Sequence, residues 1–183
     1  MPRRGGILPA MSSTPPLAAR LQLRPLQADA FARFGTVVAA PAGAAGRPIN
    51  GGNARRFDLV DDLALGTDGG RGMLALFRAE ARAWPLPITE LERHALGSQT
   101  FLPLGPLRFV LVVAPAGPAP ASAADLSAFV TDGRQGVCLA PGTWHHALLA
   151  VDAGDYAVIE RAASAPDCAL CSLAAPVWLH GPG

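Results

Sequence analysis

The sequence contains no lysine, so arginine carries all of its positive charge. Its 15 arginines nearly balance 14 acidic residues, and the formal net charge is +1. The arginines do not gather into a basic stripe, so the sequence predicts no binding to nucleic acid. Only 16% of the 183 residues are charged and 50% are hydrophobic. This composition gives enough material for the core of one domain.

Cysteine is scarce as well. Cys138 stands alone, and Cys168 and Cys171 form a single Cys-x-x-Cys pair near the C-terminus. One such pair lacks the second half of a zinc site, and it does not open a helix after a strand as a thioredoxin-type pair does. We therefore regard the pair as incidental and expect a cytoplasmic protein. No apolar run approaches the ~20 residues that span a bilayer, so no membrane partner is expected.

Turn residues divide the chain into short segments, since it contains 20 Gly and 18 Pro. Residues 1–20 have no periodicity and are expected to form a disordered extension, followed by a domain over 21–170. A short N-terminal helix is predicted over 28–34, where Gly35 ends it. Asp132–Gly133 predicts a hairpin, and residues 171–183 are expected to form an irregular tail. The predicted strands are residues 21–23, 36–39, 55–60, 73–78, 100–104, 109–113, 126–131, 137–140, 147–151 and 156–160.

Strands this short, with turns every ~8–12 residues and no βαβ rhythm, predict an all-β sandwich or barrel. Within that pattern, Glu92 and His94 lie two residues apart, so an extended strand places them on one face. A second segment, PGTWHH, puts His145 and His146 directly after a Pro-Gly turn. Because these two histidines are adjacent, a strand sends one inward and the other outward.

The spacing of Glu92, His94, Gln99 and Gly105 resembles the first cupin motif, and PGTWHH resembles the second in shortened form. Glu92 stands where a histidine is usual, and Gln99 stands where a glutamate is usual. Glu92, His94 and His145 offer donor atoms for a divalent metal, although an amide oxygen is a poor substitute for a carboxylate. A purely structural role for His94 is an equally good interpretation.

A narrower resemblance covers residues 21–168. The segments INGGNARRFDL, LALFRAEAR, PLPITELERHALGSQTFLPL, AFVTDGRQGVCLAPGTWHHALLA and VIERA resemble the ureidoglycolate lyase family, also called ureidoglycolate hydrolase. The resemblance implies a cupin-like jelly roll (double-stranded β-helix), a homodimer, and cleavage of ureidoglycolate to glyoxylate and urea in purine (allantoin) catabolism. It implies no certain cofactor, although a divalent metal is compatible with the residues.

The cleavage requires a base for the hydroxyl proton, an acid for the leaving urea nitrogen and a cation for the carboxylate. Histidine suits the first two roles at neutral pH, and arginine suits the third. The catalytic candidates are Glu92, His94, His145 and His146. The substrate-binding candidates are Asn50, Gly51, Arg78, Gln99 and Arg161. Two alternatives stay open: a metal-dependent cupin enzyme of another activity, and a non-catalytic small-molecule-binding cupin module.

Overall fold

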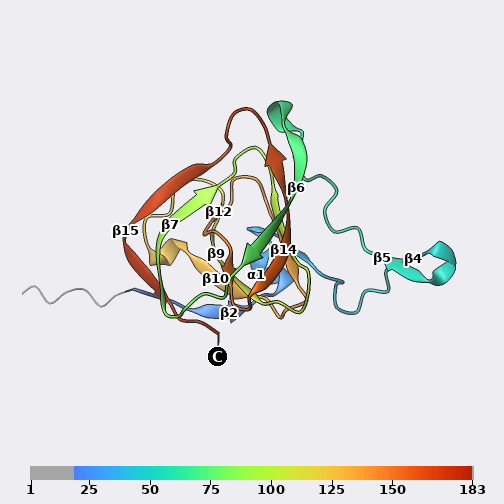
Figure 1. The fold of residues 1–183 in the computed structure, drawn as a ribbon, viewed down its shortest axis with the longest axis horizontal. Coiled ribbons are helices and arrows are strands. Elements are labelled where there is room, and N and C mark those ends of the chain that lie inside the picture. Colours follow the sequence, from blue (N-terminus) through green and yellow to red (C-terminus); the bar gives the residue numbers. More distant parts are fainter. Residues whose placement is uncertain (1–18, 183) are drawn as a thin grey trace, which may run out of the picture.

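The computed structural model describes residues 19–182, which fold into two facing β-sheets and a projecting two-stranded arm (Figure 1). The large sheet contains, in spatial order, β1 (Arg20–Leu21), β15 (Ala169–Leu179), β7 (Leu86–Arg93), β12 (Trp144–His145), β9 (Phe109–Ala114), β10 (Ser127–Val130) and β2 (Leu23–Pro25), with β13 (Leu149–Ala150) also paired to β9. The small sheet contains β3 (Gly35–Val38), β11 (Gly136–Leu139), β8 (Gln99–Pro103), β14 (Gly154–Ala162) and β6 (Arg71–Ala79). The arm contains β4 (Arg47–Ile49), the 3₁₀ turn η1 (Asn50–Gly52) and β5 (Ala54–Arg56).

One short α-helix, α1 (Ala28–Phe31), and two further 3₁₀ turns, η2 (Thr67–Gly69) and η3 (Ala123–Asp125), complete the described part of the chain. The all-β, cupin-like prediction is confirmed, and so is the short N-terminal helix. The helix is shorter than the predicted 28–34, because Phe34 donates its N–H to Phe31 O and then leads into β3. Within residues 19–182, no helix is long and apolar enough to cross a membrane.

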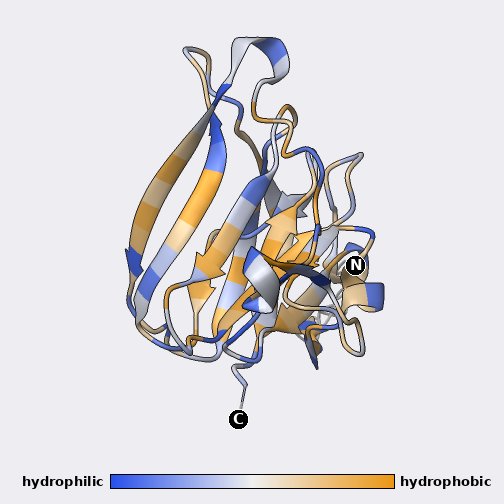
Figure 2. Cartoon of the chain, turned by 90° about the vertical axis from the view of Figure 1, so that its right-hand side faces the viewer, coloured by the Kyte–Doolittle hydropathy of each residue, from blue (hydrophilic) through white to orange (hydrophobic). Residues whose placement is uncertain are grey.

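The hydrophobic core has two parts, one on each face of the large sheet. Between the two sheets, Leu111 and Val113 of β9 pack with Phe101 of β8 and Val158 of β14. On the opposite face, the alternate residues of β9 pack with Trp144, Leu179 and their neighbours. A strand that is buried on both faces needs an apolar residue at every position, which explains the unbroken sequence FVLVVA. Several of the other strands carry bands of hydrophobic and hydrophilic residues, as the colours in Figure 2 show.

The hairpin predicted at Asp132–Gly133 is wrong. The segment connects β10 of the large sheet with β11 of the small sheet, and these strands pair with different partners. The Asp132 carboxylate accepts hydrogen bonds from the backbone N–H groups of Arg134 and Gln135, so the turn itself forms. An Asp-Gly turn has the same local hydrogen bonds whether or not the flanking strands pair with each other. The sequence therefore predicted the turn but could not show that the two strands belong to different sheets.

The irregular tail predicted over 171–183 is also wrong. Residues of this tail belong to β15, which pairs with β7 and β1, and its Val177 and Leu179 are 2% and 0% exposed. A register shift between Ser172 and Val177 interrupts the alternation that would have predicted a strand. Residues 1–18 of the predicted extension over 1–20 lie outside the described residues. Arg20 forms part of β1.

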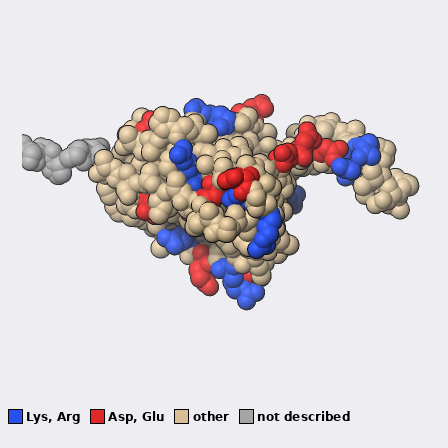
Figure 3. Space-filling model, turned by 90° about the horizontal axis from the view of Figure 1, so that it is seen from above, with Lys and Arg blue, Asp and Glu red and all other residues tan. Residues whose placement is uncertain are grey.

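Within the described part of the chain, the strands of the arm pair only with each other, and the arm stands away from the two sheets (Figures 1 and 3). Its tight turn is confirmed, since Asn50, Gly51 and Gly52 have φ values of 53°, 67° and 94°. Both charge signs gather on the arm, where Arg47 and Arg56 contact Asp58.

Candidate active site

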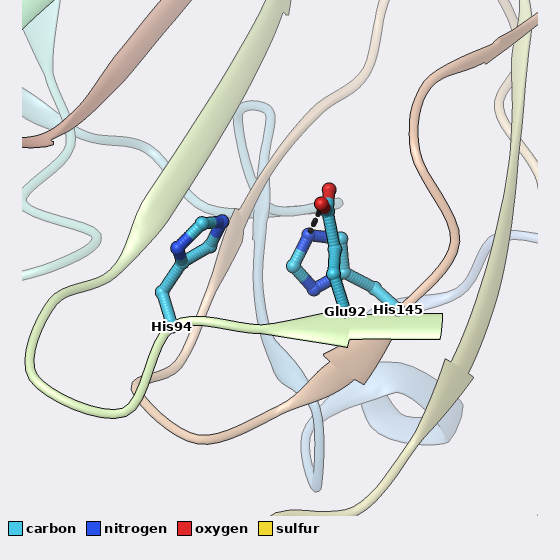
Figure 4. Close-up of side chains that lie close together, drawn as sticks. All are labelled: Glu92, His94 and His145. Carbon is cyan, nitrogen blue, oxygen red and sulfur yellow. Dashed lines mark ion pairs between the residues drawn. The ribbon is translucent and has the colours of Figure 1, made fainter. Parts of the chain in front are cut away.

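The site begins with two neighbouring strands of the large sheet. His145 on β12 is the direct register partner of Glu92 on β7, and His94 follows the end of β7 by one residue. The rings of His94 and His145 lie 5.6 Å apart, and the Glu92 side chain extends alongside the His145 ring with its carboxylate next to that ring (Figure 4). The shared face predicted for Glu92 and His94 is therefore present, and His145 joins it from the second motif.

His145 faces the interior between the sheets. Its other register partner, Val113, belongs to the core between the sheets, and His145 itself is only 2% exposed. The sequence predicted that one of the two adjacent histidines points inward, and the structure shows that this residue is His145.

Backbone carbonyl groups fix the tautomers of both imidazoles. His94 Nδ1 lies 2.6 Å from Asp167 O, and His145 Nδ1 lies 3.1 Å from Thr143 O. A carbonyl oxygen only accepts, so each Nδ1 must carry a hydrogen and donate it. The Nε2 atoms of both rings are buried and have no hydrogen-bond partner among the described residues. When a ring is neutral and its hydrogen is on Nδ1, the lone pair is on Nε2 and is free for a ligand.

The Glu92 carboxylate is the acidic group beside these two histidines. Its Oε1 lies 3.4 Å from His145 Nε2, and the side chain is 27% exposed. The nearby His145 side chain is the main cause that lowers the pKa of Glu92 below its usual 4.5, although partial burial acts in the opposite direction. Cys168 Sγ lies 3.7 Å from Glu92 Oε2, and burial, more than the nearby carboxylate, raises the pKa of this thiol. Cys168 therefore acts as a neutral donor to an ionised Glu92.

The same three residues have the donor set of a divalent metal site. One ligand atom from each of Glu92, His94 and His145 lies within 4.8 Å of the other two. Metal-binding histidines commonly donate their other ring N–H to a carbonyl group, and both rings do so here. Two nitrogen donors and one carboxylate leave open positions, as catalytic metal sites require. The residues therefore fit a metal ion.

Asp167 is the residue that sequence reasoning missed. Its carbonyl oxygen orients His94, and its carboxylate accepts hydrogen bonds from Ala95 N at 2.9 Å and Leu96 N at 2.7 Å. Asp167 thus holds the loop that carries His94. It is 73 residues away from His94 in sequence and precedes a strand that was not predicted, so no local pattern identifies it.

A second polar pair lies on the facing sheet. Gln99 on β8 is the register partner of Glu160 on β14, and Gln99 Nε2 donates to Glu160 Oε2 at 2.8 Å. Gln99 is 5% exposed. Gln99 was a substrate-binding candidate from the sequence, whereas Glu160 was not among the candidates. The hydrogen bond shows that the Glu160 side chain is used inside the fold.

Three other groups of candidates lie away from Glu92, His94 and His145. Arg78 is a highly exposed partner of Asp155, with an Nε–Oδ1 distance of 2.8 Å and a side chain that is 76% exposed. Arg161 donates to the carbonyl oxygens of Thr67 and Asp68, and so holds the turn η2. Asn50 and Gly51 lie on the arm (Figure 1). The structure does not bring these four residues to the histidine pair within the described chain.

His146 lies beside the site rather than in it. Its backbone N–H donates to Val112 O, and its Nδ1 donates to Ala147 O at 2.9 Å. Burial is the main cause that lowers the pKa of His146 below its usual 6.5, so the ring is neutral at pH 7. His146, Ala147 and Glu92 line a cavity of about 90 Å³.

A larger groove lies beside this cavity. It has a volume of about 610 Å³, and its lining includes Ala147, Phe77, Arg78 and Arg82. Ala147 lines both the groove and the small cavity that Glu92 lines, so the two are neighbours.

The fold and the site together define a cupin-like β-barrel protein with a histidine–carboxylate centre in its interior. The family model described as ureidoglycolate lyase matches residues 18–180. The chain belongs to the ureidoglycolate lyase family, as the sequence motifs predicted, and the match extends beyond residue 168 into β15.

Individual relatives agree with the family match. A ureidoglycolate lyase of Burkholderia cepacia is 44% identical over 160 residues, which cover 86% of this chain and 86% of the relative. One from Burkholderia mallei is 41% identical over 160 residues, covering 87% and 92%. One from Pseudomonas fluorescens is 39% identical over 149 residues, covering 81% and 88%.

Proposed function

We propose that this protein is a carbon–nitrogen lyase that cleaves ureidoglycolate to glyoxylate and urea. Family membership supports the substrate, and one structural observation carries the chemistry. One ring nitrogen from each of His94 and His145 and one Glu92 carboxylate oxygen lie within 4.8 Å of one another in the barrel interior. That arrangement offers one group to take a proton and one to return it, as cleavage of a carbinolamide requires.

His94 is the proposed base. Its Nδ1–H is held by Asp167 O, so the neutral ring offers the Nε2 lone pair to the substrate hydroxyl. As the hydroxyl proton moves to His94, the C–O bond becomes the aldehyde carbonyl of glyoxylate and the C–N bond breaks. The electron pair of that bond leaves with the urea nitrogen.

His145 is the proposed acid, in a pair with Glu92. The Glu92 carboxylate lies 3.4 Å from His145 Nε2, so it can accept a hydrogen bond from that nitrogen when the nitrogen carries a proton. A proton held between the two groups is then available for the leaving urea nitrogen. His146, which is neutral and lines the adjoining cavity, supports the site by packing and electrostatics.

Arg82 is the proposed partner of the substrate carboxylate. The sequence favoured Arg78, which lines the same groove but already pairs with Asp155. Arg82 forms no ion pair with any of residues 19–182, and its backbone N–H is held by Ala150 O. Arg82 lines the groove, and its charge contributes to the lowered pKa of His146. A planar guanidinium binds a carboxylate in a bidentate manner.

The donor geometry also favours a metal-dependent form of the enzyme. Glu92, His94 and His145 would hold the ion, which would supply Lewis-acid polarisation of a substrate oxygen. Metal analysis of the purified protein separates the two forms, since the metal-dependent form requires a stoichiometric ion and an activity that chelators remove.

We further propose a homodimer formed through the outer face of β6. Leu74 and Leu76 point outward on this edge strand and are 73% and 57% exposed. Exposed leucines on an open edge need covering, and a second copy of the chain would cover both. The cytoplasmic location stays a proposal, supported by three free thiols at Cys138, Cys168 and Cys171.

The test of the function is incubation with racemic ureidoglycolate while glyoxylate and urea are followed together. Equal amounts of both products are expected. Release of ammonia in place of urea would show an amidohydrolase, and ligand binding without turnover would show a non-catalytic binding module.

A further inference from the structure

Gln99 and Glu160 face the same interior as His145. Phe101 and Val158, two residues along the same strands, are register partners and belong to the core between the sheets. Residues two apart in a strand share a face, so Gln99 and Glu160 point into this space as well. His145 points into it from the large sheet, beside Val113.

The two polar groups also lie at the same end of the barrel. The short segment 94–98 is the link between β7 and β8. Glu92 lies just before this link, and Gln99 lies just after it. A short link keeps the start of β8 near the end of β7, so Gln99 on the small sheet lies at the same end of the barrel as Glu92 on the large sheet.

Glu160 fixes the orientation of the Gln99 amide. A carboxylate has only acceptor atoms, so it must receive the hydrogen bond from the NH₂ group of Gln99, at 2.8 Å. The reversed amide would place two oxygens against each other. The carbonyl oxygen of Gln99 therefore points away from Glu160. It is buried and has no hydrogen-bond partner within residues 19–182.

A buried acceptor without a partner requires an N–H or O–H donor from outside the protein. The substrate has two different ends: its carboxylate only accepts, whereas its ureido group carries N–H donors. Hydrogen-bond acceptors dominate this part of the site, namely Gln99 Oε1, Glu160 and Glu92. They repel the substrate carboxylate and suit the ureido N–H groups. The arginines lie at the other end, in the groove beyond Ala147.

We propose that Gln99 Oε1 binds the ureido N–H groups of the substrate, and that Glu160 is a positioning residue which sets the amide of Gln99 for this role. The inference rests on the proposed lyase function and deepens it, because it assigns a direction to the substrate. The ureido group lies against the small sheet, and the carboxylate lies towards the arginine groove.

Inhibition by each product tests the binding of one end of the substrate separately. Urea and glyoxylate each inhibit by occupying their own part of the site. In Gln99→Leu, the inhibition constant for urea should rise about tenfold, the magnitude expected for one lost hydrogen bond, while that for glyoxylate stays within about twofold. In Glu160→Gln, the amide of Gln99 gains a second orientation, so urea inhibition should weaken less and KM should rise more than kcat falls.

Thr100→Val is the matched control. Thr100 is adjacent, equally buried at 5% exposure, and has a hydroxyl without a hydrogen-bond partner among the described residues, but it points to the other face of β8. It should leave urea inhibition unchanged. Gln99→Met serves as a second variant of similar size, and circular dichroism establishes that each variant is folded.

Unchanged urea inhibition in folded Gln99→Leu and Gln99→Met would overturn the inference while leaving the lyase function intact. Equal weakening of urea and glyoxylate inhibition would also overturn it, because a general distortion of the site has that effect. Absence of any turnover by the wild-type protein would overturn the proposed function and this inference with it.

Discussion

At the scale of single residues, two backbone carbonyl groups decide the chemistry of the site. Thr143 O and Asp167 O each take the Nδ1–H of one histidine, so both Nε2 atoms are directed to the same place. A side-chain partner could exchange its proton with the ring, whereas a carbonyl oxygen cannot. The tautomers are consequently set by the fold and do not depend on other titrating groups.

His145→Ala should lower kcat by about 10²–10⁴-fold, because it removes acid–base assistance. KM should change less, since the substrate carboxylate is bound elsewhere. The measurement is steady-state kinetics on protein shown to be folded. His146→Ala is the control, and its effect should be much smaller because that ring bonds to Ala147 O beside the site. The reverse order of the two effects would assign the proton transfer to His146.

The residues at the centre of the site could be predicted from the sequence, because local spacing determines them. Glu92 and His94 share a face wherever the segment is extended, and PGTWHH fixes a turn before His145. Arg78 and Arg161 were harder to place, because the direction of a strand residue depends on the register with its neighbours. That register comes from contacts between distant segments, such as the β6–β14 pairing that puts Arg78 opposite Asp155.

At the scale of elements, β15 is a strand that forms because of its tertiary contacts and not because of its own sequence pattern. Its residues alternate poorly, and Pro176 interrupts the run, but an antiparallel partner in β7 and a parallel partner in β1 organise it. Pairing on both sides can sustain a strand whose own pattern is weak. The sequence predicted the strands with continuous or regular patterns, such as β9, and missed this one.

Leu179→Ala should destabilise the protein by roughly 2–5 kcal/mol, the usual cost of truncating a fully buried leucine. Leu179 is 0% exposed, whereas Leu170 on the same strand is 60% exposed. Leu170→Ala should therefore stay within about 0.5 kcal/mol of the wild type. Chemical denaturation of both variants gives the comparison. Equal stability of the two variants would mean that the end of β15 is not part of the core.

The connection between β13 and β14 has an acid-sensitive contact. Asp152 accepts hydrogen bonds from the backbone and side chain of Arg108, and the side-chain bond holds the pKa of Asp152 below its usual 3.8. Tyr156, whose pKa is raised to about 12 mainly by burial, donates to the carbonyl oxygen of Asp152 and stays protonated throughout.

A lowered pKa means that the folded state favours the ionised carboxylate. The contribution of Asp152 to stability is thus present above pH 3.8 and is lost as the pH falls through the lowered value. Asp152→Asn should be less stable than the wild type at neutral pH, and the difference should close in strong acid. Denaturation midpoints across this pH range test the prediction, which a pH-independent difference would contradict.

At the scale of the whole molecule, the open edge of the small sheet decides the assembly. Among residues 19–182, β6 pairs only with β14, and Leu74 projects from its outer face. The protein should be a dimer at micromolar concentration by light scattering. Leu74→Asp should shift it to the monomer, whereas Leu170→Asp, on the large sheet, should not. A monomeric wild type would refute the proposed interface.

The arm gives the molecule a place where the chain tolerates a break. None of residues 47–56 is buried, and an isolated two-stranded ribbon opens at little cost. The chain has no lysine and Arg47 precedes a proline, so trypsin acting within residues 21–182 should cut first after Arg55 or Arg56.

The two pieces should then stay together in gel filtration, because β1, β2 and β3 are paired with strands from the other piece. First cuts within the two sheets would contradict this. If the nicked protein still turns over ureidoglycolate, an unbroken arm is not needed for activity, and co-expression of the two pieces as separate chains becomes a route to one assembled barrel.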